Sequence, residues 1–135
     1  MTSGTAAEAE LHLALGRDPN TRLFKNAVGE AWQGSVIQIP GQPPRTILLQ
    51  NPRRVSYGLF KGSGDFIGFT RVLITPDMVG QTIAAFASLE CKAGTGRARE
   101  DQRRWRDIVN KFGGRAGVAY TPDQARAILA GQVVG

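Results

Sequence analysis

The fold is decided by two runs of sequence, Lys61-Gly-Ser-Gly-Asp-Phe-Ile-Gly68 and Thr82-Ile-Ala-Ala-Phe-Ala-Ser-Leu-Glu-Cys-Lys92. The part from Thr82 to Leu89 lacks the polar alternation of a half-exposed strand, so it predicts a strand buried on both faces. Because side chains alternate along a strand, Glu90 and Lys92 share one face and Cys91 points to the other. The sequence therefore predicts a carboxylate and an ammonium group side by side at a strand end.

This pair has two interpretations. Charged residues often flank strand ends as plain salt bridges, but burying two charges is costly and often marks a functional site. Asp65 favours a site, because it follows Gly62 and Gly64, which allow a tight turn or a close approach to a phosphate. An aspartate and a glutamate that converge would offer the oxygen ligands that Mg²⁺ prefers. A neighbouring lysine could orient a water or stabilise charge on a phosphate.

Length and composition favour one soluble domain spanning residues 1–135. No apolar run long enough to cross a membrane and no signal peptide are visible, so we expect an intracellular, cytoplasmic protein. Cys91 is the only cysteine, which excludes an internal disulfide and predicts a small core residue. His12 is also alone, which argues against a zinc site or a histidine-based hydrolase. The remaining repertoire is carboxylate and lysine chemistry.

The net charge of +6 indicates a polyanionic partner, although a merely soluble basic surface would give the same value. Clustering favours the first interpretation. Five arginines follow the Glu90 triplet within a short distance: Arg97, Arg99, Arg103, Arg104 and Arg106. The basic patch thus begins at the predicted site.

Local patterns predict the order of the elements. Met1–Thr5 should be a flexible tail, and residues 31–54 should contain a β-hairpin with a stiff loop at Pro40–Pro44. The expected helices are Ala6–Leu15, Ala98–Phe112 and a last one capped by Thr121 and Pro122, with a short capped turn at Thr75–Met78. The expected strands are Thr21–Lys25, Ser35–Ile39, Thr46–Leu49, Val55–Phe60, Asp65–Ile74, Thr82–Leu89 and Ala116–Tyr120.

Two polar residues lie on helix faces that should point inward. Glu8 would share a face with Leu11 and Leu15, which we expect to pack on the sheet; Glu10 is an alternative, and both could be solvated first-turn carboxylates. Gln102 lies one turn before Trp105 on the apolar side of its helix, so it needs a partner. A simple hydrogen bond from helix to sheet would also explain Gln102. The overall order predicts an α/β fold with a mixed central β-sheet flanked by helices and an extra β-hairpin.

The chain resembles the VRR-NUC family of virus-type replication-repair nucleases, which belongs to the PD-(D/E)XK superfamily. The similarity runs from about Glu8 to Leu129. It is carried by Gly58-Leu-Phe-Lys-Gly-Ser-Gly-Asp-Phe-Ile-Gly68, Leu89-Glu-Cys-Lys92, Gly96-Arg-Ala-Arg99, Gln102, Trp105 and Gly113-Gly-Arg-Ala-Gly-Val118, in that order. The resemblance implies a restriction-endonuclease-like core and a stand-alone member of the phage type.

The resemblance also implies roles for individual residues. The catalytic set would be Asp65, Glu90, Lys92 and Gln102. Mg²⁺ or Mn²⁺ would be held by Glu8, Asp65, Glu90 and the backbone carbonyl of Cys91. The residues expected to bind DNA are Arg22, Lys25, Asn26, Lys61, Ser63, Arg97, Arg99, Arg103 and Arg104. A solvated edge strand would explain Arg22, Lys25 and Asn26 nearly as well.

The function that these expectations describe is a metal-dependent DNA endonuclease, selective for branched or otherwise structured DNA in the manner of a Holliday junction resolvase. It would act as a homodimer in phage replication, recombination or repair, inside a phage-infected bacterium. Flap or nonspecific cleavage is equally compatible. The alternatives are a non-catalytic DNA-binding or packaging protein, and a nuclease subunit that is active only in a larger complex.

Overall fold

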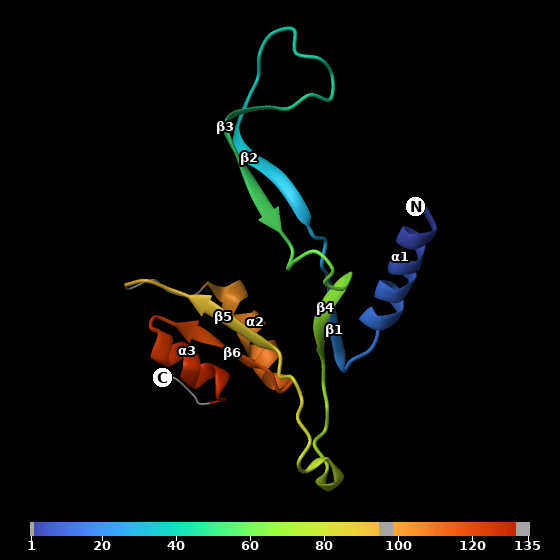
Figure 1. Ribbon diagram of the computed structural model, residues 1–135, viewed down its shortest axis with the longest axis vertical. Coiled ribbons are helices and arrows are strands. Elements are labelled where there is room, and N and C mark those ends of the chain that lie inside the picture. The colour runs from blue at the N-terminus through green and yellow to red at the C-terminus, as the bar shows by residue number, and fades with distance from the viewer. Residues whose placement is uncertain (1, 95–98, 132–135) are drawn as a thin grey trace.

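A computed structural model describes residues 2–94 and 99–131 of the chain (Figure 1). Within them the fold is mixed α/β, with three α-helices and six strands in small antiparallel and parallel sheets. The elements are α1 (Thr2–Gly16), β1 (Thr21–Lys25), β2 (Gly29–Ile37), β3 (Leu48–Tyr57), β4 (Phe66–Thr70), the 3-10 turn η1 (Pro76–Met78), β5 (Ala87–Cys91), α2 (Glu100–Lys111), β6 (Arg115–Ala119) and α3 (Pro122–Leu129).

Strands β1 and β4 form an antiparallel pair, and α1 packs beside them. The strand at Thr21–Lys25 was predicted with these bounds. The helix begins at Thr2, so part of the predicted tail is helical. The predicted packing of Leu11 and Leu15 was wrong, because both are exposed. The contacting face instead carries Glu8, which is half-buried, and His12, whose ring lies 5.3 Å from that of Phe66.

The hairpin of β2 and β3 was predicted, but its strands are longer than the sequence indicated. It projects away from the rest of the chain in Figure 1. The predicted separate strand at Val55–Phe60 is largely the end of β3, which runs to Tyr57. The start of β2 was missed because Gly29–Gln33 shows little apolar alternation. Large apolar side chains on the hairpin face solvent, with Trp32 60% and Val36 67% exposed.

Strands β5 and β6 are parallel and are connected through α2, so the three elements form a β-α-β unit. Helices α2 and α3 both contact β6. The fully or nearly buried residues of the described chain, Val109, Ala119 and Ile128, come from α2, β6 and α3. The predicted cap of the last helix is confirmed, because the Thr121 hydroxyl accepts a hydrogen bond from the Gln124 backbone nitrogen at 3.2 Å.

The segment between β4 and β5 differs from the prediction. Strand β4 ends at Thr70 rather than Ile74, and β5 begins at Ala87 rather than Thr82. Thr82–Ala85 is exposed, so the prediction of a strand buried on both faces was wrong. Cys91 is exposed rather than part of the core. The turn η1 does lie where Thr75 and Pro76 predicted it.

Five aromatic rings hold the β1–β4 pair against the β5–β6 unit. Phe69 on β4 lies 4.8 Å from Phe86 and 5.5 Å from Phe112, measured between ring centroids. Phe24 on β1 lies 5.2 Å from Trp105 on α2 in an edge-to-face arrangement. The two units thus meet through side chains and not through strand hydrogen bonds.

This packing explains why the described strands form three two-stranded sheets and not the single mixed sheet that the sequence predicted. The mixed α/β class is confirmed, whereas the restriction-endonuclease-like core stays a prediction. No helix within residues 2–94 and 99–131 is both long and apolar enough to cross a membrane.

Candidate functional site

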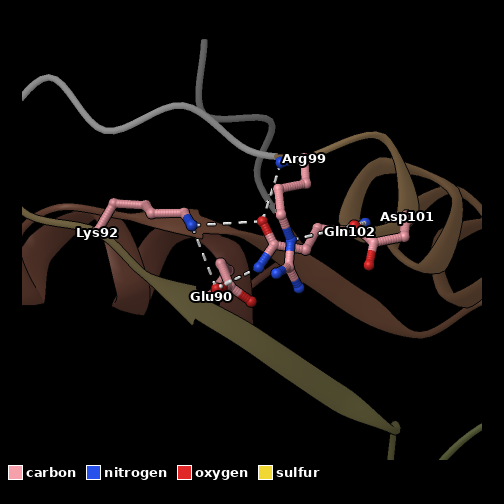
Figure 2. A network of polar contacts seen from close by, with 5 residues as sticks. All are labelled: Glu90, Lys92, Arg99, Asp101 and Gln102. Atoms are coloured by element: carbon pink, nitrogen blue, oxygen red, sulfur yellow. Dashed lines mark hydrogen bonds and ion pairs between the residues drawn. The ribbon is translucent and has the colours of Figure 1, made fainter.

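Glu90, Lys92 and Gln102 form one polar network at the end of β5 (Figure 2). The Gln102 side-chain amide nitrogen donates to Glu90 Oε1 at 2.8 Å, and Lys92 Nζ donates to Gln102 Oε1 at 3.3 Å. Lys92 Nζ also lies 3.5 Å from Glu90 Oε1. The Lys92 side chain is 19% exposed and that of Glu90 is 37% exposed, so the group sits at the border between protein and solvent.

Strand and helix periodicity create this network. Ser88, Glu90 and Lys92 alternate along one side of β5, while Gln102 and Trp105 lie one turn apart on α2. The Trp105 indole nitrogen donates to the Ser88 hydroxyl at 2.8 Å, one step along the strand from the Gln102–Glu90 bond. Residues two apart on the strand, Ser88 and Glu90, therefore face residues three apart on the helix, Trp105 and Gln102. These two hydrogen bonds fix α2 to β5.

The start of α2 orients the Gln102 amide. Gln102 Oε1 accepts the Arg99 backbone N–H at 3.0 Å, and Asp101 Oδ1 accepts the Gln102 backbone N–H at 2.9 Å. A side-chain oxygen that satisfies a free backbone N–H is a helix-capping interaction. With its oxygen held by Arg99 and Lys92, the Gln102 amide must direct its nitrogen toward Glu90.

A second polar site lies at the Gly-rich turn before β4. Glu8, Lys25, Lys61 and Asp65 line a hollow of about 360 Å³ together with Asn26, Ala27, Val28, Gly62 and Ser63. Lys25 Nζ lies 3.5 Å from Glu8 Oε2. Of the two competing helix carboxylates, Glu8 lines the hollow and is half-buried, whereas Glu10 is exposed.

The predicted metal ligands therefore lie in two places. Glu8 and Asp65 belong to the hollow, while Glu90 is engaged by Gln102 and Lys92. Across residues 2–94 and 99–131, no group of three or more histidine, cysteine, aspartate or glutamate side chains is placed to hold a metal ion. The cause is the arrangement of the strands, because β4 and β5 are not paired. In this conformation the carboxylates do not fit one shared ion.

The residues predicted to bind DNA divide into four groups. Lys25 and Lys61 are exposed beside the hollow. Arg99, Arg103 and Arg104 are exposed at the start of α2, where Glu100 and Asp101 form ion pairs with them at 3.3 to 3.8 Å. Arg97 lies outside the described residues.

Arg22, Asn26 and Ser63 are engaged within the protein. The Arg22 guanidinium lies 4.9 Å from the centroid of the Phe112 ring and donates to the Thr21 carbonyl at 3.0 Å. The Asn26 amide donates to the Ser63 hydroxyl at 2.8 Å, and that hydroxyl donates to the Phe60 carbonyl at 2.6 Å. The three side chains predicted to bind DNA therefore make contacts within the protein instead.

Sequence reasoning missed two contributions. Arg71, an exposed residue directly after β4, has its guanidinium 4.6 Å from the centroid of the Phe112 ring. Ser88 binds Trp105, and the only available signal was its position two residues before Glu90 on the same strand face.

The chain was compared with protein-family models, with curated proteins and with solved structures, and none of the three comparisons found a match.

Proposed function

We propose that this chain is a nuclease that hydrolyses phosphodiester bonds in DNA. The observation that carries the proposal is the Glu90–Gln102–Lys92 network, in which a strand-end ammonium group is held beside a carboxylate by a helix amide. Glu90 and Lys92 come from one segment of the family motif and Gln102 from another, and they meet at a partly exposed position. The exposed arginines Arg99, Arg103 and Arg104 lie on the adjoining turn of α2.

The network suits chemistry on a phosphate diester. An ammonium group carries three N–H donors, and Lys92 directs one of them to Gln102. Its remaining donors and its charge can bind a phosphate oxygen and stabilise the negative charge that develops there during attack by water. Glu90 Oε1 accepts from Gln102, while Oε2 takes part in none of these contacts and can accept a proton from a water.

Dependence on Mg²⁺ or Mn²⁺ remains a proposal that rests on the resemblance to VRR-NUC nucleases. The carboxylates Glu8, Asp65 and Glu90 occupy two places, so we assign no step to an ion here. Selectivity for branched DNA and a role in phage replication, recombination or repair have the same basis, whereas the proposed cytoplasmic location rests on the sequence pattern. The exposed arginines would bind backbone phosphates without reading bases.

A homodimer is supported by the exposed surface. The chain exposes 10967 Å². A compact protein of 14.5 kDa exposes about 6,900 Å². The excess, about 4,100 Å², is several times the roughly 800 Å² that a standard interface removes from each partner, so one such interface would cover only part of it. Apolar side chains of the hairpin, such as Trp32 and Ile47, are part of this exposed surface. Light scattering measures the mass in solution, and a monomer at all concentrations would contradict this part of the proposal.

The competing function is a DNA-binding protein without catalysis. The observation that favours it is that Gln102 also fixes α2 to β5, so the network could be a structural bridge. In that case the wild-type protein would cleave no DNA, and replacing Lys92 or Glu90 would change only stability or binding.

The test is cleavage of labelled four-way junction, flap, single-stranded and duplex DNA, with Mg²⁺, Mn²⁺ or EDTA. Lys92→Ala and Glu90→Ala should abolish cleavage and leave DNA binding nearly intact. Lys111→Ala, an exposed lysine in the last turn of α2, loses the same charge and should cleave normally. Wild-type protein that binds every substrate and cuts none would support the competing function. Paired symmetric nicks in the junction would identify resolvase activity.

A further inference from the structure

Asn26 follows the last residue of β1 and makes four hydrogen bonds to the Gly-rich turn. Its backbone nitrogen donates to the Asp65 carbonyl at 2.7 Å. Its side-chain nitrogen donates to the Ser63 hydroxyl and to the Gly64 carbonyl, both at 2.8 Å. Its side-chain oxygen accepts the Leu59 backbone N–H at 3.1 Å. Asn26 thus contacts the turn at its beginning, middle and end.

The turn needs such support because it has few bonds of its own. Gly62 has a φ of 96°, a backbone conformation that glycine adopts readily. Within the turn the Ser63 nitrogen and hydroxyl both donate to the Phe60 carbonyl, at 3.0 and 2.6 Å. The strand pairing of β4 starts only at Phe66. Asn26 therefore substitutes for the strand hydrogen bonds that the turn lacks.

The bonding capacity of the Asn26 side chain is largely used. An asparagine amide has two N–H donors and one carbonyl oxygen. In this structure both donors go to the turn, and the oxygen accepts from Leu59. No N–H of the Asn26 side chain remains for a phosphate. In this structure Asn26 therefore lacks the free donor that the predicted contact with DNA would need.

We propose that Asn26 is a positioning residue, which fixes the turn so that Asp65 and Lys61 line the hollow opposite Glu8. The residue before Asn26, Lys25, pairs with Glu8 at 3.5 Å on the α1 side of the same hollow. The Asn26 side chain thereby fixes the turn that carries Asp65 to the end of β1. The role of Asn26 in activity rests on the proposed nuclease function, whereas its hold on the turn does not.

The experiment compares Asn26→Ala and Asn26→Asp with wild type. Aspartate has the same shape and can still accept from Leu59, but it loses both donors to Ser63 and Gly64. For both variants we expect kcat for DNA cleavage to fall about 10- to 100-fold, as for other displaced catalytic groups. The Kd of Asn26→Ala for DNA in EDTA should stay within about twofold of wild type, because no phosphate contact is lost.

Asn110→Ala is the matched control for a merely structural effect. The Asn110 side chain also makes two backbone hydrogen bonds, to the Ala116 carbonyl at 3.0 Å and from the Ala116 nitrogen at 2.9 Å, and it is remote from the hollow-lining residues in the sequence. Its loss should lower stability to a similar degree as Asn26→Ala but leave kcat unchanged at a temperature where both variants are folded.

Hydrogen exchange at the Leu59 amide gives a readout that does not need cleavage, and it should be faster in Asn26→Ala. If wild type cuts no DNA, the proposed function fails, and faster exchange at Leu59 still supports the hold on the turn. Unchanged exchange at Leu59 would overturn the inference. A kcat for Asn26→Ala equal to that of wild type would also overturn the inference. This holds both if DNA binding weakens, as loss of a phosphate contact would require, and if DNA binding is unchanged.

Discussion

The substitution Gln102→Glu tests the orientation of the amide in the network at the end of β5. Glutamate preserves the shape of the side chain. Its oxygen can still accept from Lys92 and from the Arg99 nitrogen, which lie 3.3 and 3.0 Å from Gln102 Oε1. The amide nitrogen, however, donates to Glu90 Oε1 at 2.8 Å. In the variant an oxygen faces that oxygen, so a hydrogen bond becomes a contact between two carboxylates.

The magnitude follows from two effects. A hydrogen bond to a charged group contributes about 1.5 to 3 kcal/mol, and the variant loses one. The new negative charge is repelled by Glu90 and attracted by Lys92 over similar distances, 2.8 and 3.3 Å, so these Coulomb energies largely offset each other. Because the Glu90 side chain is 37% exposed, water screens what remains. We expect the free energy of unfolding to fall by about 2 kcal/mol at pH 7.

Urea unfolding followed by circular dichroism measures this difference. The control is Gln124→Glu, because Gln124 Oε1 accepts the Tyr120 backbone N–H at 2.8 Å in the first turn of α3, where a negative charge is tolerated. That variant should stay within about 0.5 kcal/mol of wild type. Equal stability of both variants at pH 7 would refute the assigned amide orientation.

Three further changes follow from the contacts described above. Gly68→Ala should disrupt the β1–β4 pair and prevent stable folding in thermal unfolding experiments, because an added Cβ would lie 1.9 Å from a carbonyl oxygen of β1. Trp105→Phe keeps the ring packing but loses the bond to Ser88, so unfolding free energy should fall by about 1 kcal/mol, and Ser88→Ala in the same chain should add little. The double variant Arg103→Ala with Arg104→Ala should weaken DNA binding and reduce the slope of log affinity against log salt by about 2, and an unchanged slope would exclude phosphate contacts there.

The grouping of Gln102 with Glu90 and Lys92 could be predicted from sequence because it depends on short-range geometry. An alternating strand and the helix that follows it each have a fixed period, and the residues at matching steps face one another. The cap at Thr121 was predictable for the same reason, since it depends on neighbouring residues alone; Thr75 does precede η1 as predicted, but its side chain makes no capping hydrogen bond.

The relation between Asp65 and Glu90 could not be read from local patterns. It depends on whether β4 pairs with β5, and in this structure the two strands belong to different sheets. Polar side chains present the same difficulty. Asn26 and Arg22 looked like phosphate ligands, but their partners lie far along the chain, at Ser63 and Phe112, and no spacing rule predicts those contacts.

The loop of the projecting hairpin separates two parts of the chain that remain paired through their strands. The loop joining β2 and β3 contains Arg45, an exposed residue with a φ of 59° that trypsin could cut. Such a cut would separate α1, β1 and β2 from all later elements, yet β1 pairs with β4 and β2 pairs with β3 across the break. The two pieces would therefore stay together without a covalent link. The protein could thus be assembled from two separately expressed halves.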